Sequence, residues 1–257
     1  MTPIVNLAGK RGLVVGIANG HSIAAGCATA FRQAGAELAL TYLNDKALPF
    51  IRPVADGLGT ALLLPCDVRI PGQLEAVFER IAQEWGRLDF LLHSIAFAPR
   101  EDLHASVVDC SAEGFAMAMD VSCHSFIRMA KLAAPLMTEG GSLMTVSFYG
   151  ADRVVENYNL MGPVKAALES SVRYMAADLA PRRIRAFAIS AGAIRTRAAS
   201  GIDRFDDLLD RVRARTPAGR LVGIEDVGRI AAFLASEAAA PMSGSVVHAD
   251  NGAHTVA

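Results

Sequence analysis

Short apolar runs alternate with longer amphipathic stretches along the whole chain, and no linker or low-complexity tract interrupts the pattern. Strands that are apolar throughout, rather than at every second position, are typical of a parallel sheet covered on both faces. The pattern therefore predicts an α/β protein with one doubly wound parallel sheet of about seven strands and helices on both of its faces. We expect strands near residues 12–15, 37–42, 61–66, 90–95, 142–147, 185–190 and 245–248.

The amphipathic stretches between these runs predict helices. The clearest lie at residues 22–34, with Gly35 as terminator, and at residues 71–85, 112–137, 158–180 and 224–235. One stretch breaks the alternation, because residues 193–221 are long and polar in parts and lie between a strand and the last helix. Insertions at strand ends are usually lids or substrate loops. We therefore expect a single domain over residues 1–257, with a substrate-binding loop at about residues 193–221.

Composition and charge narrow the function classes. A chain of 257 residues that is 52% hydrophobic and 20% charged can bury a substantial core within one domain. Its formal net charge is -1 with acidic and basic residues interspersed, so neither nucleic acid nor a membrane surface is an expected partner. The N-terminus lacks the cationic start and apolar core of a signal peptide, and no apolar run approaches membrane-spanning length. We expect a cytoplasmic protein.

Neither the cysteines nor the histidines form a pattern typical of a metal site. The cysteines include no Cys-x-x-Cys pair, which fits reduced and mostly buried thiols. The histidines are too dispersed to predict a cluster or a catalytic role, so we expect no bound metal. The residues are Cys27, Cys66, Cys110 and Cys123, and His21, His93, His104, His124, His248 and His254.

A glycine-rich turn follows the first expected strand. In the segment Gly-Ile-Ala-Asn-Gly-His-Ser, Gly16 and Gly20 permit a tight turn, and Ser22 lies where a helix begins. The unpaired N–H groups and the positive dipole end of such a helix favour a pyrophosphate. Because the spacing differs from Gly-x-Gly-x-x-Gly, an ordinary strand-to-helix turn is the alternative interpretation.

Two further strand ends support a Rossmann-type dinucleotide site, and a third bears on which dinucleotide is bound. Asp67 follows the third strand, where its carboxylate can accept from an adenine amino group, and the small residues around Ile95 allow a cofactor to approach the backbone. Leu43, after the second strand, is neither the basic residue usual for NADP nor the acidic residue usual for NAD. Asp45 weakly disfavours a 2′-phosphate and Lys46 weakly favours one. We favour NADH, with NADPH as the alternative.

Tyr158 and Lys165 are the candidate catalytic pair. They are seven positions apart, and on a helix this spacing brings both side chains to within about 20° of one face. A phenol and an ammonium on one face suit a proton donor and a cofactor clamp. A solvated surface pair is the alternative interpretation.

The chain resembles the NADH-dependent enoyl-acyl-carrier-protein reductases of bacterial fatty acid synthesis, a divergent branch of the short-chain dehydrogenases/reductases. The similarity covers nearly the whole chain in one register. The gap of six residues between Tyr158 and Lys165 matches this branch, whereas the wider superfamily has a gap of three. The motifs that carry the resemblance are Ser-Phe-Tyr-Gly-Ala-Asp-Arg at 147–153, Asn-Tyr-Asn-Leu-Met-Gly at 157–162, Ile-Ser-Ala-Gly-Ala-Ile-Arg-Thr at 189–196 and Ala-Ala-Ser-Gly-Ile at 198–202.

The resemblance implies a role for each matching position, an acyl-carrier-protein substrate and a homotetramer. The implied cofactor-binding residues are Gly16, Ser22 and Ile23 at the pyrophosphate, Leu43 at the adenosine ribose, Asp67 and Val68 at the adenine, Ile95 and Lys165 at the nicotinamide half, and Ile194, Thr196 and Ala198 near the carboxamide and pyrophosphate. The implied substrate-binding residues are Ala98, Tyr158, Arg197 and Ile202.

The chemistry of enoyl thioester reduction accounts for the catalytic pair. Hydride reaches the β-carbon and negative charge grows on the thioester oxygen, where a protonated Tyr158 can donate a hydrogen bond. Lys165 suits the binding of the nicotinamide ribose hydroxyls, because its ammonium is a compact charge on a flexible stem.

Two departures from the family pattern point to a specialised member. Phe148 stands where many relatives have a second tyrosine, which leaves its catalytic role in doubt, and Tyr149 beside it faces the other side of the strand. Arg197 replaces an apolar residue near the acyl pocket, where it would repel an aliphatic tail or attract a carboxylate or phosphate. The alternatives are a reductase of another activated alkene or carbonyl, or a dinucleotide-binding paralogue without catalysis.

Overall fold

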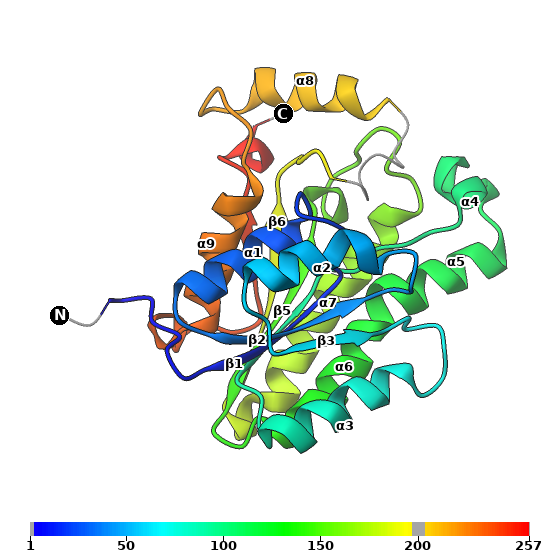
Figure 1. Cartoon of the computed structure of the whole chain (residues 1–257). Helices are drawn as coiled ribbons and strands as arrows, with labels where there is room; N and C mark the ends of the chain where they lie inside the picture. Colours follow the sequence, from blue (N-terminus) through cyan, green and yellow to red (C-terminus); the bar gives the residue numbers. More distant parts are fainter. Residues whose placement is uncertain (1–2, 197–203, 257) are drawn as a thin grey trace.

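The computed structural model describes residues 3–196 and 204–256, and its seven strands form one parallel sheet (Figure 1). The strand order is β3-β2-β1-β4-β5-β6-β7, so the chain proceeds outward from β1 to one edge and then returns to place β4 on the other side of β1. This order puts the topological switch point between β1 and β4, and parallel pairing puts every strand's carboxyl end at the same edge. The strands are β1 (Arg11–Val15), β2 (Glu37–Tyr42), β3 (Leu62–Pro65), β4 (Phe90–His93), β5 (Gly141–Ser147), β6 (Ile184–Ala191) and β7 (Ser245–Ala249).

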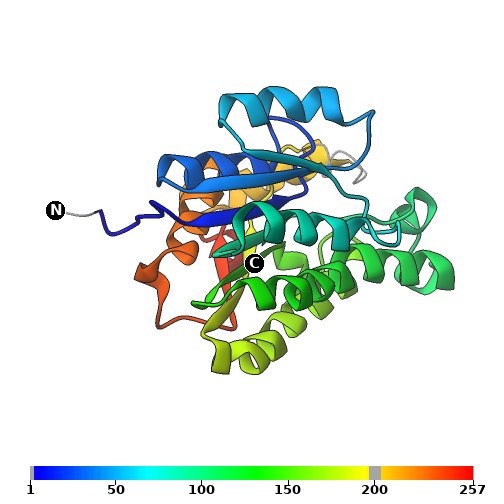
Figure 2. The same cartoon turned by 60° about the horizontal axis from the view of Figure 1, so that its bottom comes forward.

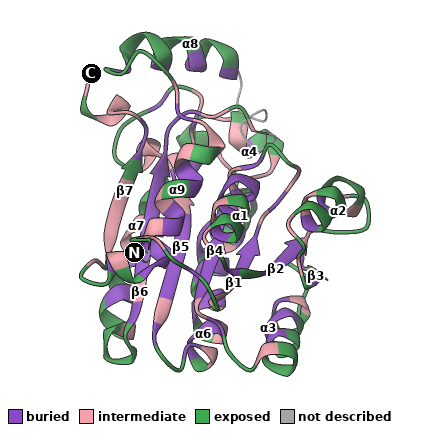
Figure 3. Cartoon of the chain, turned by 60° about the vertical axis from the view of Figure 1, so that its left-hand side comes forward, coloured by how far each residue is buried: buried purple, intermediate pink, exposed green. Residues whose placement is uncertain are grey.

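Helices cover both faces of the sheet, which is why its central strands are apolar at consecutive positions (Figure 2, Figure 3). Leu13 packs into the hydrophobic core on one face, whereas its neighbour Val14 packs into the core on the other. The first face carries α3 (Gln73–Trp85), α6 (Ser125–Ala133) and α7 (Met161–Leu179), and the second carries α1 (Ile23–Gln33), α2 (Leu48–Gly57) and α9 (Ile224–Ala235). The predicted fold class is confirmed, and each observed strand starts and ends within two residues of its expected bounds.

The helix expected over residues 112–137 is interrupted. The structure has α5 (Ala112–Met119), a π-helical turn η2 (Asp120–His124), then α6, and a final 3-10 turn that contains Pro135. In the π turn, Ser122 Oγ accepts from the backbone N–H of Phe97 and donates to its carbonyl oxygen, both at 2.9 Å. The turn thereby fixes the segment that follows β4. Periodicity alone cannot detect such a tertiary contact, so the prediction of one continuous helix was wrong.

The helix expected to begin at Tyr158 begins instead at Met161. Asn157 and Asn159 have φ angles of 63° and 40°, in the left-handed region that asparagine tolerates better than most residues. Tyr158 therefore lies in a turn before α7. The argument that placed Tyr158 and Lys165 on one helical face was wrong, although both side chains are buried.

The predicted substrate-binding loop contains a helix, α8 (Phe205–Arg215), which lies across the carboxyl-end edge of the sheet (Figure 1). Its buried residues Phe205, Leu208, Leu209 and Val212 follow helical spacing. Among the described residues no helix is both long and apolar enough to cross a membrane. The remaining short elements are α4 (Arg100–His104), η1 (Val107–Asp109), η3 (Ala134–Leu136), η4 (Tyr149–Ala151), η5 (Ala180–Arg182), η7 (Glu237–Ala239) and η8 (Ala253–Thr255).

Candidate active site

The turn from β1 to α1 lies at the topological switch point, beside the end of β4. Gly16 has a φ of 105°, and a Cβ at this position would lie 2.1 Å from the carbonyl oxygen of Ser94, at the end of β4. Only glycine allows this approach. Ser22 caps α1, because its Oγ accepts from the N–H of Ala25 at 3.3 Å. The start of α1 therefore lies at the switch point, where its N–H groups suit a pyrophosphate.

Leu43 and Asp67 lie along the same edge, beyond β2 and β3. Leu43 is 48% exposed, so its side chain is accessible to a ligand. Asp67 is buried, and its carboxylate accepts from Arg69 Nε at 3.0 Å and Nη2 at 2.7 Å. These charge-assisted bonds hold the pKa of Asp67 below its ordinary value, so the carboxylate is ionised. Val68 beside it is also buried.

Lys165 lies in the core at the end of β5. Its side chain is 5% exposed, and its Nζ donates to the carbonyl oxygen of Val146 at 2.7 Å. Burial lowers the pKa of Lys165 to about 8. This is the only hydrogen bond of the ammonium within residues 3–196 and 204–256, so two of its three N–H groups remain for a ligand.

Tyr158 is held by aromatic and backbone contacts. It is 8% exposed, and its ring centroid lies 4.9 Å from that of Phe148, which in turn lies 4.4 Å from that of Tyr149. The expectation that Tyr149 and Phe148 face opposite sides of a strand was wrong, because β5 ends at Ser147 and Tyr149 begins η4. A Cβ on Gly150 would lie 2.6 Å from Tyr158 Cδ1, so this glycine makes room for the ring. Burial raises the pKa of Tyr158 above its ordinary value, and the charge of Glu169 adds to the effect. The phenol is therefore protonated at neutral pH.

Sequence reasoning missed the roles of two polar side chains near this site, Glu169 and His93. Glu169 Oε1 accepts from Ser147 Oγ at 2.5 Å, and burial raises the pKa of Glu169. Glu169 is four positions after Lys165 on α7, a spacing that the sequence alone could have revealed. His93 is buried, with Nδ1 2.8 Å from Thr145 Oγ1 and Nε2 2.9 Å from a serine hydroxyl. Burial is the main cause that lowers the pKa of His93 to about 3.

The remaining predicted site residues divide into two groups. Ile23, Ile95, Ala98, Ile194 and Thr196 are partly buried and follow the ends of β1, β4 and β6, at the carboxyl-end edge. Arg197, Ala198 and Ile202 lie outside the described residues.

The expectation that the histidines form no cluster was wrong for two of them. The rings of His248 and His254 stack with centroids 3.6 Å apart, and Asp250 completes a group whose possible metal-ligand atoms lie within 4.8 Å of one another. The Asp250 carboxylate already accepts from the backbone N–H groups of Gly252 and His254 and contacts His254 Nδ1 at 2.8 Å. The carboxylate of Asp250 therefore already has hydrogen-bond partners within the turn at residues 250–254. Sequence spacing missed the group because His248 is on β7 and His254 is on η8.

The doubly wound sheet, the glycine turn and the helix start at the switch point define a Rossmann-type dinucleotide-binding protein. A family profile described as Enoyl-(Acyl carrier protein) reductase matches residues 16–254. The chain belongs to this family, which confirms the resemblance seen in the sequence.

Individual relatives agree with this assignment. The chain is 47% identical to a Salmonella typhimurium protein named enoyl-(acyl-carrier-protein) reductase (NADH), over 96% of this chain and 94% of the relative. The structure of the Anaplasma phagocytophilum reductase in complex with NAD is 44% identical, with a TM-score of 0.94 over 97% of this chain and 95% of that one. The Bacillus cereus reductase, solved with NADP+ and an indole naphthyridinone, is 43% identical, with a TM-score of 0.95 over 98% of each chain.

Proposed function

We propose that the chain reduces the trans-2 double bond of an enoyl thioester, carried by acyl carrier protein or coenzyme A, with NADH as reductant. The observation that carries the proposal is the burial of Tyr158 and Lys165 at the carboxyl-end edge of the sheet, where the switch point between β1 and β4 also lies. Family membership over residues 16–254 supports the same reaction.

The residues at the switch point suit a nicotinamide dinucleotide. Gly16 leaves space that a Cβ would fill, the start of α1 suits the pyrophosphate, and Lys165 keeps two N–H groups for the nicotinamide ribose. When bound, the nicotinamide supplies the hydride. The further proposed cofactor-binding residues are Ser22, Ile23, Leu43, Asp67, Val68, Ile95, Ile194, Thr196 and Ala198.

The protein's chemical contribution is to stabilise the charge that grows on the thioester oxygen as the β-carbon is reduced. Tyr158 donates a hydrogen bond to this oxygen, and its raised pKa keeps the proton on the phenol. Loss of one such donor typically raises the barrier by about 3 kcal/mol. The buried ammonium of Lys165 adds positive potential near the site. Ala98, Arg197 and Ile202 are proposed to line the acyl pocket, and Phe148 is proposed to position Tyr158.

The test is the oxidation of NADH, with NADPH in parallel, by purified protein and a trans-2-enoyl thioester on acyl carrier protein or coenzyme A. The proposal expects rapid oxidation that the Tyr158→Phe substitution removes. Turnover of a carbonyl compound instead would favour the alternative reductase, and tight NADH binding without turnover of either would favour a binding protein.

The proposed assembly is a cytoplasmic homotetramer. Large apolar side chains are exposed on the helices of one face, with Tyr174 on α7 72% exposed, Phe115 on α5 39% exposed and Ile127 on α6 36% exposed. Exposed apolar residues on neighbouring helices suit an interface between copies. Sedimentation velocity of the protein and of a Tyr174→Glu variant tests this, with a smaller species expected for the variant. A monomer at micromolar concentration would contradict it.

A further inference from the structure

Two histidines and one aspartate meet beyond the end of β7. His248 is on β7, Asp250 directly follows the strand, and His254 is in η8, near the end of the described chain. Asn251 and Gly252 have φ angles of 55° and 83°, in the left-handed region, so the chain reverses after β7 and η8 folds back onto the strand. None of the three side chains is a proposed cofactor-binding or substrate-binding residue, so they form a separate group.

Asp250 orients the ring of His254. The Asp250 side chain is 3% exposed, and its Oδ2 lies 2.8 Å from Nδ1 of His254. Because an ionised carboxylate only accepts hydrogen bonds, Nδ1 donates, and the neutral ring then carries its lone pair on Nε2. Histidines that bind a metal ion almost always donate their other ring N–H to a carboxylate, a carbonyl or water. His254 therefore presents Nε2 as a free ligand atom.

His248 supplies the second imidazole. It is exposed, and its ring makes no hydrogen bond with residues 3–196 or 204–256. Its ring centroid lies 3.6 Å from that of His254, with an angle of 12° between the two planes. The lone pairs of stacked rings lie in nearly parallel planes, so an ion that binds both rings requires His248 to turn about its Cβ–Cγ bond. No hydrogen bond within the described residues opposes this turn, and the torsion is a soft one.

The spacing and the charge of the group both suit a cation. The possible ligand atoms of His248, Asp250 and His254 lie within 4.8 Å of one another. Ligand atoms of one tetrahedral ion with bonds of about 2.1 Å are roughly 3.4 Å apart, so a small movement of the exposed ring closes the difference. The negative charges of Asp250 and Asp152 both act on His248. Their potential favours a positive ion beside the rings.

We propose that His248 and His254 bind one divalent transition-metal ion through a ring nitrogen each, with Asp250 as the hydrogen-bond partner that orients His254 and water in the remaining positions. Imidazole ligands suit Zn²⁺, Ni²⁺ and Cu²⁺, whereas Mg²⁺ and Ca²⁺ prefer oxygen. The proposal replaces the expectation of no bound metal, because folding rather than sequence spacing brings the two histidines together. Binding at this site requires neither the cofactor nor Tyr158, so it is independent of the proposed reductase activity.

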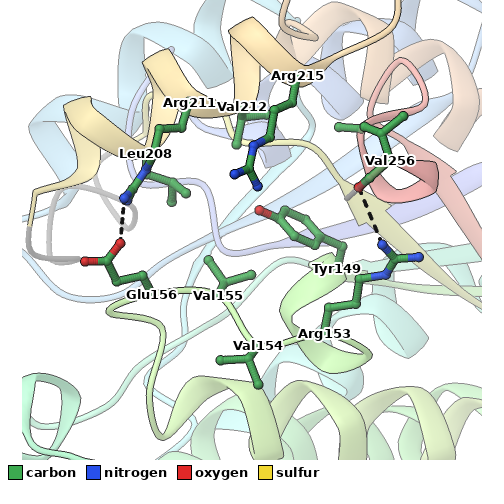
Figure 4. A pocket seen from close by; sticks show the side chains of 11 residues that line it. Tyr149, Arg153, Val154, Val155, Glu156, Leu208, Arg211, Val212, Arg215 and Val256 are labelled. Carbon is green, nitrogen blue, oxygen red and sulfur yellow. Dashed lines mark hydrogen bonds and ion pairs between the residues drawn. The ribbon is translucent and has the colours of Figure 1, made fainter.

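An ion at this site joins η8 to the end of β7. The chain continues from η8 to Val256, which lines the cavity between α8 and residues 149–156 (Figure 4). A bound ion therefore stabilises the fold and fixes the segment that leads to one wall of this cavity.

Isothermal titration calorimetry of the untagged whole chain, after treatment with EDTA and removal of the chelator, tests the proposal with Ni²⁺ as the probe. We expect one Ni²⁺ ion per chain with a Kd in the micromolar range, and we expect Mg²⁺ to bind at least a hundredfold more weakly. Absence of saturable Ni²⁺ binding up to about 1 mM would overturn the proposal.

Variants of the two histidines locate the ion. His248→Gln and His254→Gln are each expected to weaken Ni²⁺ binding at least tenfold, and both residues are accessible enough to be replaced without disturbing the core. His124→Gln is the matched control, because His124 also contacts a carboxylate, that of Asp120 at 3.0 Å, but belongs to no group of three possible ligands among the described residues. It is expected to leave the affinity within about twofold. Equal effects of all three substitutions would contradict the assignment.

Electron paramagnetic resonance of the Cu²⁺-loaded protein counts the imidazole ligands directly. The signal is expected to show coupling to two imidazole nitrogens in the unmodified protein and to one in His248→Gln. Coupling to two nitrogens that persists in His248→Gln would place the ion elsewhere and overturn the proposal. Since neither measurement needs turnover, a failure of the reductase proposal would leave both results readable.

Discussion

The ammonium of Lys165, on α7, donates to the backbone carbonyl oxygen of Val146, near the end of β5, at 2.7 Å. This bond joins the second turn of α7 to β5 of the sheet and holds a buried cation near the carboxyl end of that strand. Tyr158 is held separately, in a turn and against Phe148. The two residues therefore have different supports, and their proposed roles can be separated by mutation.

Cofactor binding is expected to depend on Lys165 rather than on Tyr158. Lys165→Ala removes the donors proposed for the ribose hydroxyls, so the Kd for NADH is expected to rise at least tenfold. A tenfold rise corresponds to a loss of about 1.4 kcal/mol in the free energy of binding. Tyr158→Phe is expected to leave the Kd within about twofold. Fluorescence titration with NADH measures both, and an equal loss of affinity in the two variants would contradict the division of roles.

NADH affinity is expected to fall as the pH rises above about 8. Burial lowers the pKa of Lys165 in the free protein to about 8, and the bound dinucleotide favours the charged form, so binding takes up a proton once the pH exceeds this value. Titrations between pH 6.5 and pH 9.5 measure the effect, and Lys165→Met is expected to remove it. An affinity that is constant over this range in the unmodified protein would refute the prediction.

Acid sensitivity of folding is expected from His93. In the unfolded chain His93 takes up a proton near its ordinary pKa of 6.5, whereas the folded protein resists protonation until about pH 3. The unfolded state thus binds more protons between these values, and the free energy of unfolding falls as the pH falls, by up to about 1.4 kcal/mol per pH unit.

Urea unfolding from pH 7 to pH 4 measures this dependence. The slope of the free energy of unfolding against pH reports how many more protons the unfolded state binds. His93→Gln is expected to lower this number by about one. His21→Gln, at an exposed position, is the control and is expected to leave the slope unchanged. The same slope in His93→Gln as in the unmodified protein would assign the acid sensitivity to other groups.

Cofactor preference is expected to change at Leu43. This exposed residue lies directly after β2, where a basic side chain can pair with a 2′-phosphate. Leu43→Arg is expected to tighten NADPH binding about tenfold. Leu43→Gln, which is of similar size but uncharged, is the control, and an equal gain in both variants would show that charge is not the cause.

The sheet and its switch point follow from the sequence because the buried parallel strands are apolar at consecutive positions. The exact ends of the helices do not follow from the sequence. Left-handed Asn157 and Asn159 place Tyr158 outside α7, and Ser122 stabilises a π turn through its contacts with Phe97. Such features depend on tertiary contacts that no local pattern records.

The candidate site was predictable in part. Gly16, Ser22 and Asp67 were proposed from their positions after strands, and the structure places them at the carboxyl-end edge. Tyr158 and Lys165 were proposed from their spacing and from the family resemblance, and both are buried although the helical argument for them failed. The stacking of His248 on His254 was not predictable, because the two residues belong to different elements that meet only in the folded chain. The cavity at Arg153, Arg211 and Arg215 that Figure 4 shows was missed for the same reason, since α8 contributes Arg211 and Arg215 and a distant segment contributes Arg153.

The most direct test of the central claim is the rate of NADH oxidation with a trans-2-enoyl thioester in the unmodified protein and in Tyr158→Phe. The loss of the oxyanion donor is expected to lower kcat by about 10²- to 10³-fold while the Kd for NADH stays within about twofold. An unchanged kcat in Tyr158→Phe would contradict the account, because Tyr158 would then not be the donor to the thioester oxygen.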